Sequence, residues 1–305
     1  MAKNPYFKEK VKAIEVNRKS VSELLDAMAN TGFQGRKLAE VAHTWEKMVK
    51  DPRVTILFGY AASLSTTGQW KIVNWLIENR YIDVLVATGA NLSEDIVEAM
   101  GNSYWKGSHL ENDLDLLKTD VNRYYDVYGS EIDYMEMTEL IAEFIITLDQ
   151  EHKYSSREFL YLILDGVKDY VEFMRLSENV KDTAVVYIGG GVPKDFIQLF
   201  AVTADLLYPD RKVPNRAGSQ IREGVTEEQY YPHKYAVQIT TDSPQWGSLS
   251  GCTFDEAVSW GKETKQGRYI QCYCDATIAL PIISHALAER LNVKREGRQF
   301  GLRFK

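Results

Sequence analysis

A short run near the C-terminus, residues 256–262, holds the residues best suited to covalent chemistry. It reads EAVSWGK, so Lys262 follows Trp260 by two positions and Glu256 opens the run. An indole ring beside a lysine amine shields the amine from water and lowers the pKa of that amine. This prepares the lysine to form a Schiff base. Glu256 can pair with a cationic amine or move a proton. The alternative is a solvated surface lysine, because lysine is rarely buried without a partner.

Other residue types that often do chemistry show no usable pattern. The histidines at positions 43, 109, 152, 233 and 285 lack metal-ligand spacing, and no Ser/His/Asp order stands out. The cysteines are too few for a disulfide framework, and their odd number suits a reducing compartment. They are Cys252, Cys272 and Cys274. We therefore expect no metal site and no disulfide.

Four turns rich in small or polar residues follow predicted strands. In a parallel sheet the carboxyl ends of the strands share one edge, where ligands bind. Glycines let backbone amides approach a ligand, and helix N-termini favour phosphate. None of the turns holds the G-x-G-x-x-G fingerprint, so each alone is equally well a tight turn. Together they indicate a large ligand such as a dinucleotide. The segments are GYAASLSTTG (59–68), ATGANLSED (87–95), IGGGVPK (188–194) and ITTDSPQWGSLSG (239–251).

The elements that position these turns alternate between strands and helices. A helical stretch at 21–50 comes first, and it is broken by NTGFQG. Five strand patterns follow, and each leads through a turn or polar loop toward a helix or the next strand. We therefore predict an α/β fold with a doubly wound parallel sheet. It forms a single large domain, residues 1–305, with residues 1–50 as a helical N-terminal extension. The patterns occupy 54–80, 82–100, 183–200, 234–251 and 269–291.

Two stretches fall outside this scheme. Residues 112–181 are predicted to be largely helical and acidic, with no chemistry of their own. Residues 209–233 are polar and interrupted by proline and glycine, which predicts a loop or lid.

Composition and charge limit the classes of function. The chain has 305 residues, 45% of them hydrophobic, a net charge of -7 and a pI near 5.4. Phosphate backbones need a basic surface, so we expect no nucleic-acid partner, and a cationic small molecule fits this balance better. No stretch approaches the ~20 apolar residues of a membrane span. We expect a cytoplasmic protein with no membrane association.

Four motifs together resemble the deoxyhypusine synthase family, including its bacterial deoxyhypusine synthase-like and homospermidine synthase branch. The motifs are EAVSWGK, VLVATGAN, GGGVPK and CDATIALP, and the resemblance runs from about Ser20 to Leu291. It implies a Rossmann-like homotetramer that binds NAD near subunit interfaces. It also implies that NAD oxidises spermidine, that a lysine captures the aminobutyl group as an imine, and that an acceptor amine then takes the group over.

The resemblance assigns roles to individual residues. Lys262 is the imine-forming lysine, and Trp260, Glu256 and Glu94 lie on the polyamine side. The NAD-binding segments contain Ala62, Ser63, Leu64, Ser65, Thr66, Thr88, Gly89, Ala90, Gly190, Thr241, Asp242, Asp275 and Ala276.

The sequence departs from the family pattern at three places. Trp246 and Leu249 stand where eukaryotic members carry two aspartates, and Asp195 replaces a histidine. We expect Trp246 and Asp195 to contact the polyamine. The third departure is a shortened segment after Leu164, where the family has a further strand and turn.

The sequence leaves two functions open. The first is an NAD-dependent aminobutyltransferase whose acceptor is putrescine, giving homospermidine, or a translation-factor lysine, giving deoxyhypusine. The second is a catalytically inactive homologue that binds NAD or polyamine.

Overall fold

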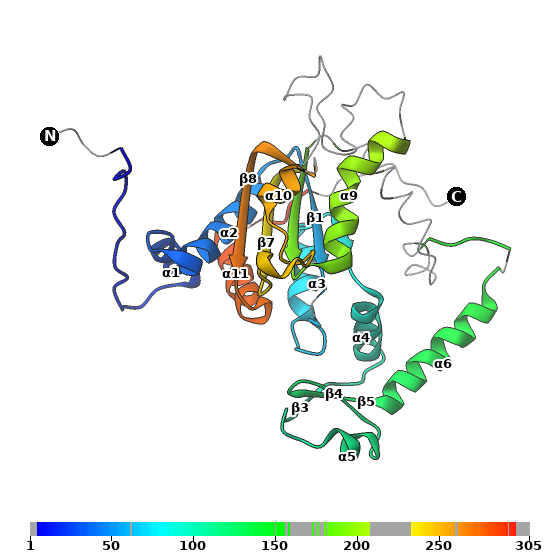
Figure 1. The fold of residues 1–305 in the computed structure, drawn as a ribbon. Coiled ribbons are helices and arrows are strands. Elements are labelled where there is room, and N and C mark those ends of the chain that lie inside the picture. The colour runs from blue at the N-terminus through cyan, green and yellow to red at the C-terminus, as the bar shows by residue number, and fades with distance from the viewer. Residues whose placement is uncertain are drawn as a thin grey trace.

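Five parallel strands form the central sheet of the protein, in the order β2-β1-β6-β7-β8 (Figure 1). The structure is a computed structural model. It describes residues 5–61, 63–149, 151–155, 158, 173, 176, 180, 182–207, 233–259, 262–291 and 293–296. The strands are β1 (Val54–Tyr60), β2 (Val84–Val86), β6 (Asp182–Ile188), β7 (His233–Thr240) and β8 (Glu263–Tyr273).

Helices cover both faces of this sheet (Figure 1). On one face, α1, α2 and α11 form a layer, and alternate side chains of β1 from Val54 to Tyr60 point into it. On the other face, Leu57 packs in a second core with residues of α9 and α10. The helices bordering the sheet are α1 (Val21–Ala29), α2 (Phe33–Lys50), α3 (Trp70–Glu78), α4 (Gly89–Ala99), α9 (Gly191–Leu207), α10 (Phe254–Ser259) and α11 (Ala276–Arg290).

The predicted α/β class and parallel sheet are confirmed, and so are the two helices within residues 21–50. Numbered by their order in the chain, the five strands lie across the sheet in the order 2-1-3-4-5. All of them are parallel, but the side on which the chain adds strands reverses between β1 and β6. That order differs from the 3-2-1-4-5-6 order of a Rossmann sheet and is the other common doubly wound arrangement. In such sheets, ligands bind at the carboxyl ends of the two strands that flank the reversal.

A glycine lets α9 lie close to β1 at this point. A Cβ added to Gly59 would stand 2.8 Å from Cδ1 of Ile197 and 3.4 Å from the carbonyl oxygen of Pro193. Both contacts are with the first half of α9. The small residue therefore brings the start of α9 next to the end of β1.

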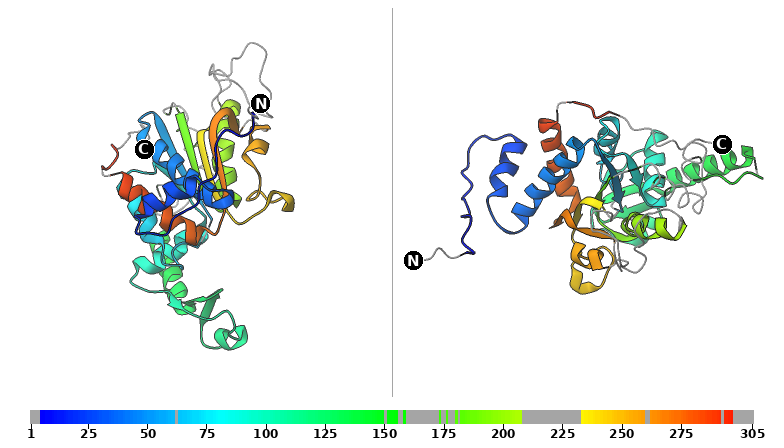
Figure 2. Two further views of the ribbon diagram at one scale, coloured as in Figure 1. Left: turned by 90° about the vertical axis from the view of Figure 1, so that its left-hand side faces the viewer. Right: turned by 90° about the horizontal axis from the view of Figure 1, so that it is seen from above.

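A second, antiparallel sheet extends below the main body in Figure 1, and Figure 2 shows it from two further sides. Its strand order is β3-β5-β4. The sequence reading did not find these strands in a stretch expected to be largely helical. The hairpin turn is Tyr125 and Asp126, with Tyr125 at φ 57°, and it lacks the Asn-Gly signature of such turns. The unit contains β3 (Trp105–Lys106), α5 (Asp113–Leu117), β4 (Val121–Tyr124), β5 (Val127–Ser130) and α6 (Glu131–Thr147).

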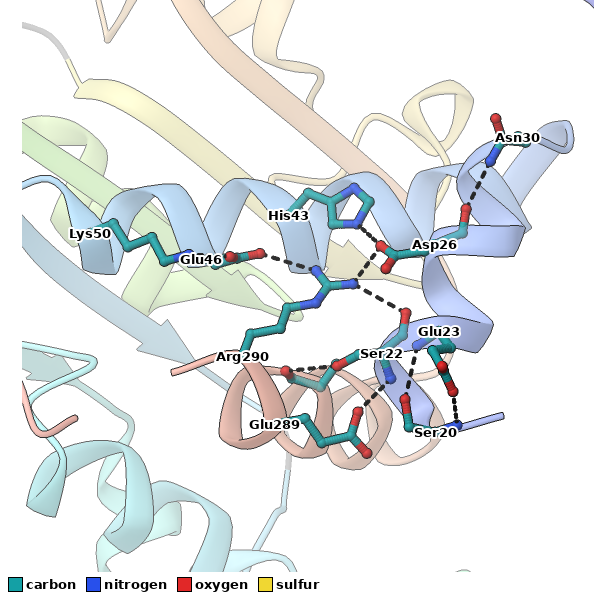
Figure 3. Close-up of polar contacts among 11 residues, drawn as sticks. Ser20, Ser22, Glu23, Asp26, Asn30, His43, Glu46, Lys50, Glu289 and Arg290 are labelled. Carbon is teal, nitrogen blue, oxygen red and sulfur yellow. Dashed lines mark hydrogen bonds and ion pairs between the residues drawn. The ribbon is translucent and has the colours of Figure 1, made fainter. Parts of the chain in front are cut away.

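The N-terminal helices are tied to α11 by an arginine (Figure 3). The guanidinium of Arg290 donates to Oδ1 of Asp26 at 2.7 Å and to Oε2 of Glu46 at 3.1 Å. Its neighbour Glu289 accepts the backbone N–H groups of Val21 and Ser22 at 3.1 and 2.6 Å. A carboxylate at a helix N-terminus satisfies unpaired donors and opposes the positive end of the helix dipole. Residues 20–50 are therefore docked against the last helix.

We predict that Arg290→Met lowers the free energy of unfolding by about 1 to 2 kcal/mol, because it removes charge-assisted hydrogen bonds from a side chain that is only 12% exposed. Chemical denaturation followed by circular dichroism measures the change. Lys118→Met is the matched control, since its ion pair with Asp115 is 72% exposed on the lysine side. Equal effects of the two substitutions would contradict the role of Arg290 in holding the N-terminal helices against α11.

Candidate functional site

The carboxyl edge of the sheet gathers the turns that the sequence predicts to bind a cofactor. Thr88 caps α4 by accepting the N–H of Asn91, and Gly89 and Ala90 are exposed in the first turn. Gly190 lies between β6 and α9, and Thr241 is exposed directly after β7. Asp275 follows β8, and its carboxylate accepts from N and Oγ1 of Thr277 at 2.7 and 2.5 Å. Asp275 therefore already has a structural role as the cap of α11, which begins at Ala276.

The turn after β1 faces the acidic helix α4. Ser63 is exposed, and Ser65 and Thr66 are buried together with Leu64. The hydroxyl of Ser65 donates to Oδ1 of Asp95. Ala62 lies outside the described residues.

Glu94 is a buried carboxylate at the base of this turn. It is 3% exposed, and burial raises its pKa, opposed by hydrogen bonds from the Ser63 side chain and the Thr66 backbone. Within the described part of the chain, its Oε2 has no hydrogen-bond partner. Burial also raises the pKa of Asp95. The pair thus offers acceptor capacity that the protein itself does not fill.

Three tyrosines connect Glu94 to the second sheet, and the sequence reading gave no role to them. The hydroxyl of Tyr134 is 2.8 Å from those of both Tyr104 and Tyr124, and Tyr104 also donates to the Glu94 carbonyl at 3.4 Å. Burial raises the pKa of Tyr104 to about 12. Tyr124 ends β4, Tyr134 lies in α6 and Tyr104 directly precedes β3, so no local pattern could indicate the chain of hydroxyls.

The turns after β6 and β7 are joined by a buried amide. Nε2 of Gln238 donates to the carbonyl oxygens of Gly189 and Ser250, at 2.8 Å in each case. A Cβ on Gly190 would lie 2.4 Å from Cα of Ser250, so only glycine fits there. In the second turn, Asp242 accepts from Oγ of Ser248 at 2.7 Å.

Lys262 directly precedes β8, so it lies at the amino end of that strand, whereas Asp275 lies at the carboxyl end. Its side chain is 16% exposed, and Nζ stands 3.4 Å from Oδ1 of Asp195 in α9. The structure therefore brings together two of the predicted polyamine-side residues. The interpretation of Lys262 as a solvated surface charge does not fit this burial.

The remaining predicted polyamine residues are placed differently. Glu256 is exposed on α10, and its side chain is hydrogen-bonded to the thiol of Cys252. Trp246 is 73% exposed at the end of the short helix η2 (Pro244–Trp246). Trp260 lies outside the described residues, so its expected contact with Lys262 stays a prediction.

Two buried charged residues that the sequence reading missed lie beside Lys262. Lys194 is 1% exposed, and Nζ donates to Oε1 of Gln238 at 3.0 Å and to the carbonyl of Cys252 at 2.8 Å. Burial lowers the pKa of Lys194 to about 8. Glu263 is fully buried, and burial raises its pKa well above the ordinary value. A lysine in the first turn of a helix normally reaches solvent, so no sequence pattern indicates that Lys194 is buried.

This arrangement defines an α/β protein with glycine-containing turns at the carboxyl edge of its sheet and a partly buried lysine near the start of α9. The family model for deoxyhypusine synthase matches residues 23–163 and 160–287. A Methanosarcina mazei protein named "Probable deoxyhypusine synthase 2" is 39% identical, over 94% of this chain and 92% of its own length. The chain therefore belongs to the deoxyhypusine synthase family, as its motifs indicated.

Further relatives extend the comparison. An Archaeoglobus fulgidus protein named "Probable deoxyhypusine synthase 2" is 38% identical, over 85% of this chain and 95% of its own. The "Deoxyhypusine synthase-like protein" of Chlorobaculum tepidum is 29% identical, over 98% and 95%. The crystal structure of an Entamoeba histolytica protein assigned as a deoxyhypusine synthase has a TM-score of 0.54 at 13% identity, over 94% of this chain and 100% of that one. The last likeness shows a shared fold.

The matches also locate the predicted shortened segment. The two parts of the family match meet at residues 160–163, next to Leu164. The alignment with the Methanosarcina mazei protein spans 338 positions, more than the 305 residues of this chain. The relative therefore carries residues that this chain lacks. The junction itself lies outside the described residues, as does nearly all of the predicted loop at 209–233. No described helix is both long and apolar enough to cross a bilayer.

We predict that His233 contributes a pH-dependent part of the stability. It is fully buried, and its Nδ1 shares a hydrogen bond of 2.8 Å with Oγ1 of Thr183. Burial lowers its pKa from 6.5 to about 4. His233 binds a proton more readily in the unfolded chain than in the folded protein. The contribution of His233 to the free energy of unfolding is therefore fully present above pH 6.5 and is lost as pH falls from 6.5 to 4.

His233→Asn keeps a polar atom near Thr183 but does not titrate in this range. We expect the loss of stability between pH 6.5 and 4 to be smaller than in the wild type, by about 3 kcal/mol. Urea unfolding at a series of pH values measures the slope, and His285→Asn, at an exposed helical site, is the control. Equal slopes for His233→Asn and the wild type would contradict the assignment.

Proposed function

We propose that the protein transfers the aminobutyl group of spermidine to an acceptor amine through an imine on Lys262, with NAD as cofactor. Membership of the deoxyhypusine synthase family makes it a transferase. The observation that carries the proposal is Lys262 itself, within EAVSWGK, with an amine largely withdrawn from water and 3.4 Å from the Asp195 carboxylate. A lysine of this kind can give up a proton and attack an electrophilic carbon.

The residues near the lysine suit transfer of an alkylamine. A new bond forms between Nζ of Lys262 and the terminal carbon of the aminobutyl group. This carbon must lose a hydride to reach the imine level, and bound NAD would supply the acceptor for it. The bond from the carbon to the secondary nitrogen of spermidine breaks, and that nitrogen takes up a proton given up by Nζ and leaves as 1,3-diaminopropane. Asp195 is placed to take the proton that Nζ must lose before it attacks. Glu256 and Glu94 are carboxylates that can pair with the remaining ammonium groups.

The carboxyl edge fits a dinucleotide on two observations. The turns at Gly89 and Gly191 leave open space where a side chain would stand, and both lie at helix N-termini that favour phosphate. When bound, NAD would supply the hydride acceptor and donor that the oxidation of spermidine and the reduction of the product need.

A catalytically inactive homologue that binds NAD or polyamine is the second candidate. The observation that favours it is the break in the family match at residues 160–163, where relatives have additional residues. The two candidates share the cofactor edge and differ in whether Lys262 becomes modified.

We predict that borohydride treatment of the protein with spermidine and NAD adds an aminobutyl mass to the peptide that contains Lys262. Lys262→Ala removes the amine, and Lys262→Arg replaces it with a guanidinium that stays protonated, so both should lose the adduct and the transfer activity. Lys118→Arg, at an exposed site, should keep both.

Transfer at nearly the wild-type rate by Lys262→Ala would reject the proposed lysine. NAD binding without any adduct on the wild type would instead support the inactive homologue.

We also predict that putrescine is an acceptor and that the product is homospermidine. A free diamine brings a second ammonium, which the exposed ring of Trp246 can hold by a cation–π attraction of about 0.5 to 2 kcal/mol. Trp246→Ala should therefore weaken polyamine use by about tenfold. Trp105→Ala is the matched control, because Trp105 is 66% exposed on the second sheet.

Chromatography of the products with putrescine, and separately with the translation-factor protein, identifies the acceptor. Modification of the protein alone would show that the small-amine assignment is wrong.

A further inference from the structure

Helix α6 carries a row of side chains that the rest of the described chain leaves exposed. Its members are spaced alternately by three and four residues, so they lie on one side of the helix. The buried Met137 lies on the other side. Ile146, at the end of the row, is 79% exposed. All five members are exposed, and they are Ile132, Met135, Glu139, Ala142 and Ile146.

The surface around this row is acidic as well as apolar. Within its 17 residues, α6 has five carboxylates and no lysine or arginine. Glu139 belongs to the row, and Glu136 and Glu143 directly follow Met135 and Ala142. All three glutamates are exposed. A segment that covers the row must therefore offer both apolar and positively charged side chains.

A segment with this composition stands before α1. Residues 5–19, the N-terminal arm, contain no helix or strand. Lys12 joins the backbone of the arm to the loop after α1, because its N–H donates to the carbonyl of Asn30 at 3.0 Å. Phe7 is 85% exposed, and Val11 and Ile14 are exposed as well. The arm has two acidic side chains, Glu9 and Glu15, and five basic ones, Lys8, Lys10, Lys12, Arg18 and Lys19.

The arm also matches α6 in the spacing of its apolar residues. Phe7, Val11 and Ile14 are separated by four and three residues, as are members of the row on α6. They would share one face of the arm if it became helical on binding. Lysine stems can cover apolar surface while their ammonium groups reach carboxylates at its edge. The arm thus offers both kinds of side chain that α6 requires.

The arm and α6 of one molecule lie far from each other. In Figure 1 the arm leaves the main body beside α1, and α6 lies on the opposite side of that body. The view from above in Figure 2 separates them in the same way. A contact between these two segments therefore needs a second molecule. In a two-fold dimer each copy gives its arm and receives that of its partner, so the same contact forms twice.

We propose that the N-terminal arm of one copy packs along α6 of a second copy of this chain, with its lysines against Glu136, Glu139 and Glu143. Fully extended, the arm spans up to about 50 Å, and α6 is about 25 Å long, so the arm can follow the whole helix. Burial of the apolar row stabilises the contact, and the opposite charges select this surface. The inference goes beyond the proposed function and does not depend on Lys262.

The test is cross-linking of the whole protein by a carbodiimide, which joins a lysine amine directly to a carboxylate in contact with it. A denaturing gel separates copies that are joined to each other from single copies, and mass spectrometry identifies the linked peptides. We expect a peptide of the arm joined to a peptide of α6 in the band of two copies. The same pair should be missing from the band of single copies.

Two charge-reversed variants test the pairing of charges. Lys8→Glu/Lys10→Glu/Lys12→Glu makes the arm acidic, and Glu136→Lys/Glu139→Lys/Glu143→Lys makes α6 basic. Each alone should weaken self-association by at least about tenfold in sedimentation equilibrium, because like charges then face each other. The two variants mixed together should associate as the wild type does and regain the cross-link, because each arm then meets an α6 of opposite charge.

A matched control changes the net charge by the same amount at exposed sites elsewhere. This variant is Lys50→Glu/Lys71→Glu/Lys118→Glu, and it should associate and cross-link as the wild type does. Circular dichroism establishes that each variant folds, and the cross-link of the wild type needs no variant.

Several results would overturn the proposal. They are a protein that stays monomeric in sedimentation, a band of two copies whose links join only other segments, and a link between arm and α6 within single copies. Equal weakening by the control variant also overturns it, since only the net charge would then matter. Binding of the wild type to phosphatidylserine vesicles without any link to α6 would assign the arm to a membrane surface instead.

Discussion

The buried amide of Gln238 is the contact on which the candidate site depends most. It is fully buried in the middle of the sheet, and it donates to a carbonyl in each of the two turns that follow β6 and β7. Its oxygen accepts from Lys194 and Gln271. A buried polar network of this kind specifies one arrangement of its surroundings, because each broken bond leaves an unsatisfied group. The glycine turn after β6 and the loop that leads to α10 are thus held by one side chain.

The parts of the fold that follow from local pattern were predictable. Continuous apolar runs such as 54–60 indicate buried parallel strands, and the spacing of apolar residues within 21–50 indicates helices. The small sheet was missed because β3 has two residues and β4 and β5 have four each, too short for a visible alternation. The strand order also depends on packing between distant segments, so the reversal between β1 and β6 could not be read from the chain.

The site was predictable to a different degree. The glycine turns and Lys262 carry motifs, and the structure places Lys262 beside Asp195 as two members of one cluster. Lys194 and Glu263 carry no sequence signal, because whether a charged residue is buried is decided by the elements packed over it. Lys194 is covered by Phe254 of α10 and by the loop before that helix. Burial is what gives both residues their unusual proton affinities.

The hydrogen bonds between α1 and α11 have a consequence for how the chain folds. The contact between Val21 and Glu289 joins residues 268 positions apart. A contact of such separation forms only after a large loss of chain entropy, and during synthesis it must wait for the C-terminal helix to emerge. Until then α1, whose Leu25 is buried in the core, lacks the contacts that α11 supplies. The layer of α1 and α2 is therefore made well before α11 and is completed only when α11 docks, so it is a surface that a chaperone would meet on the ribosome.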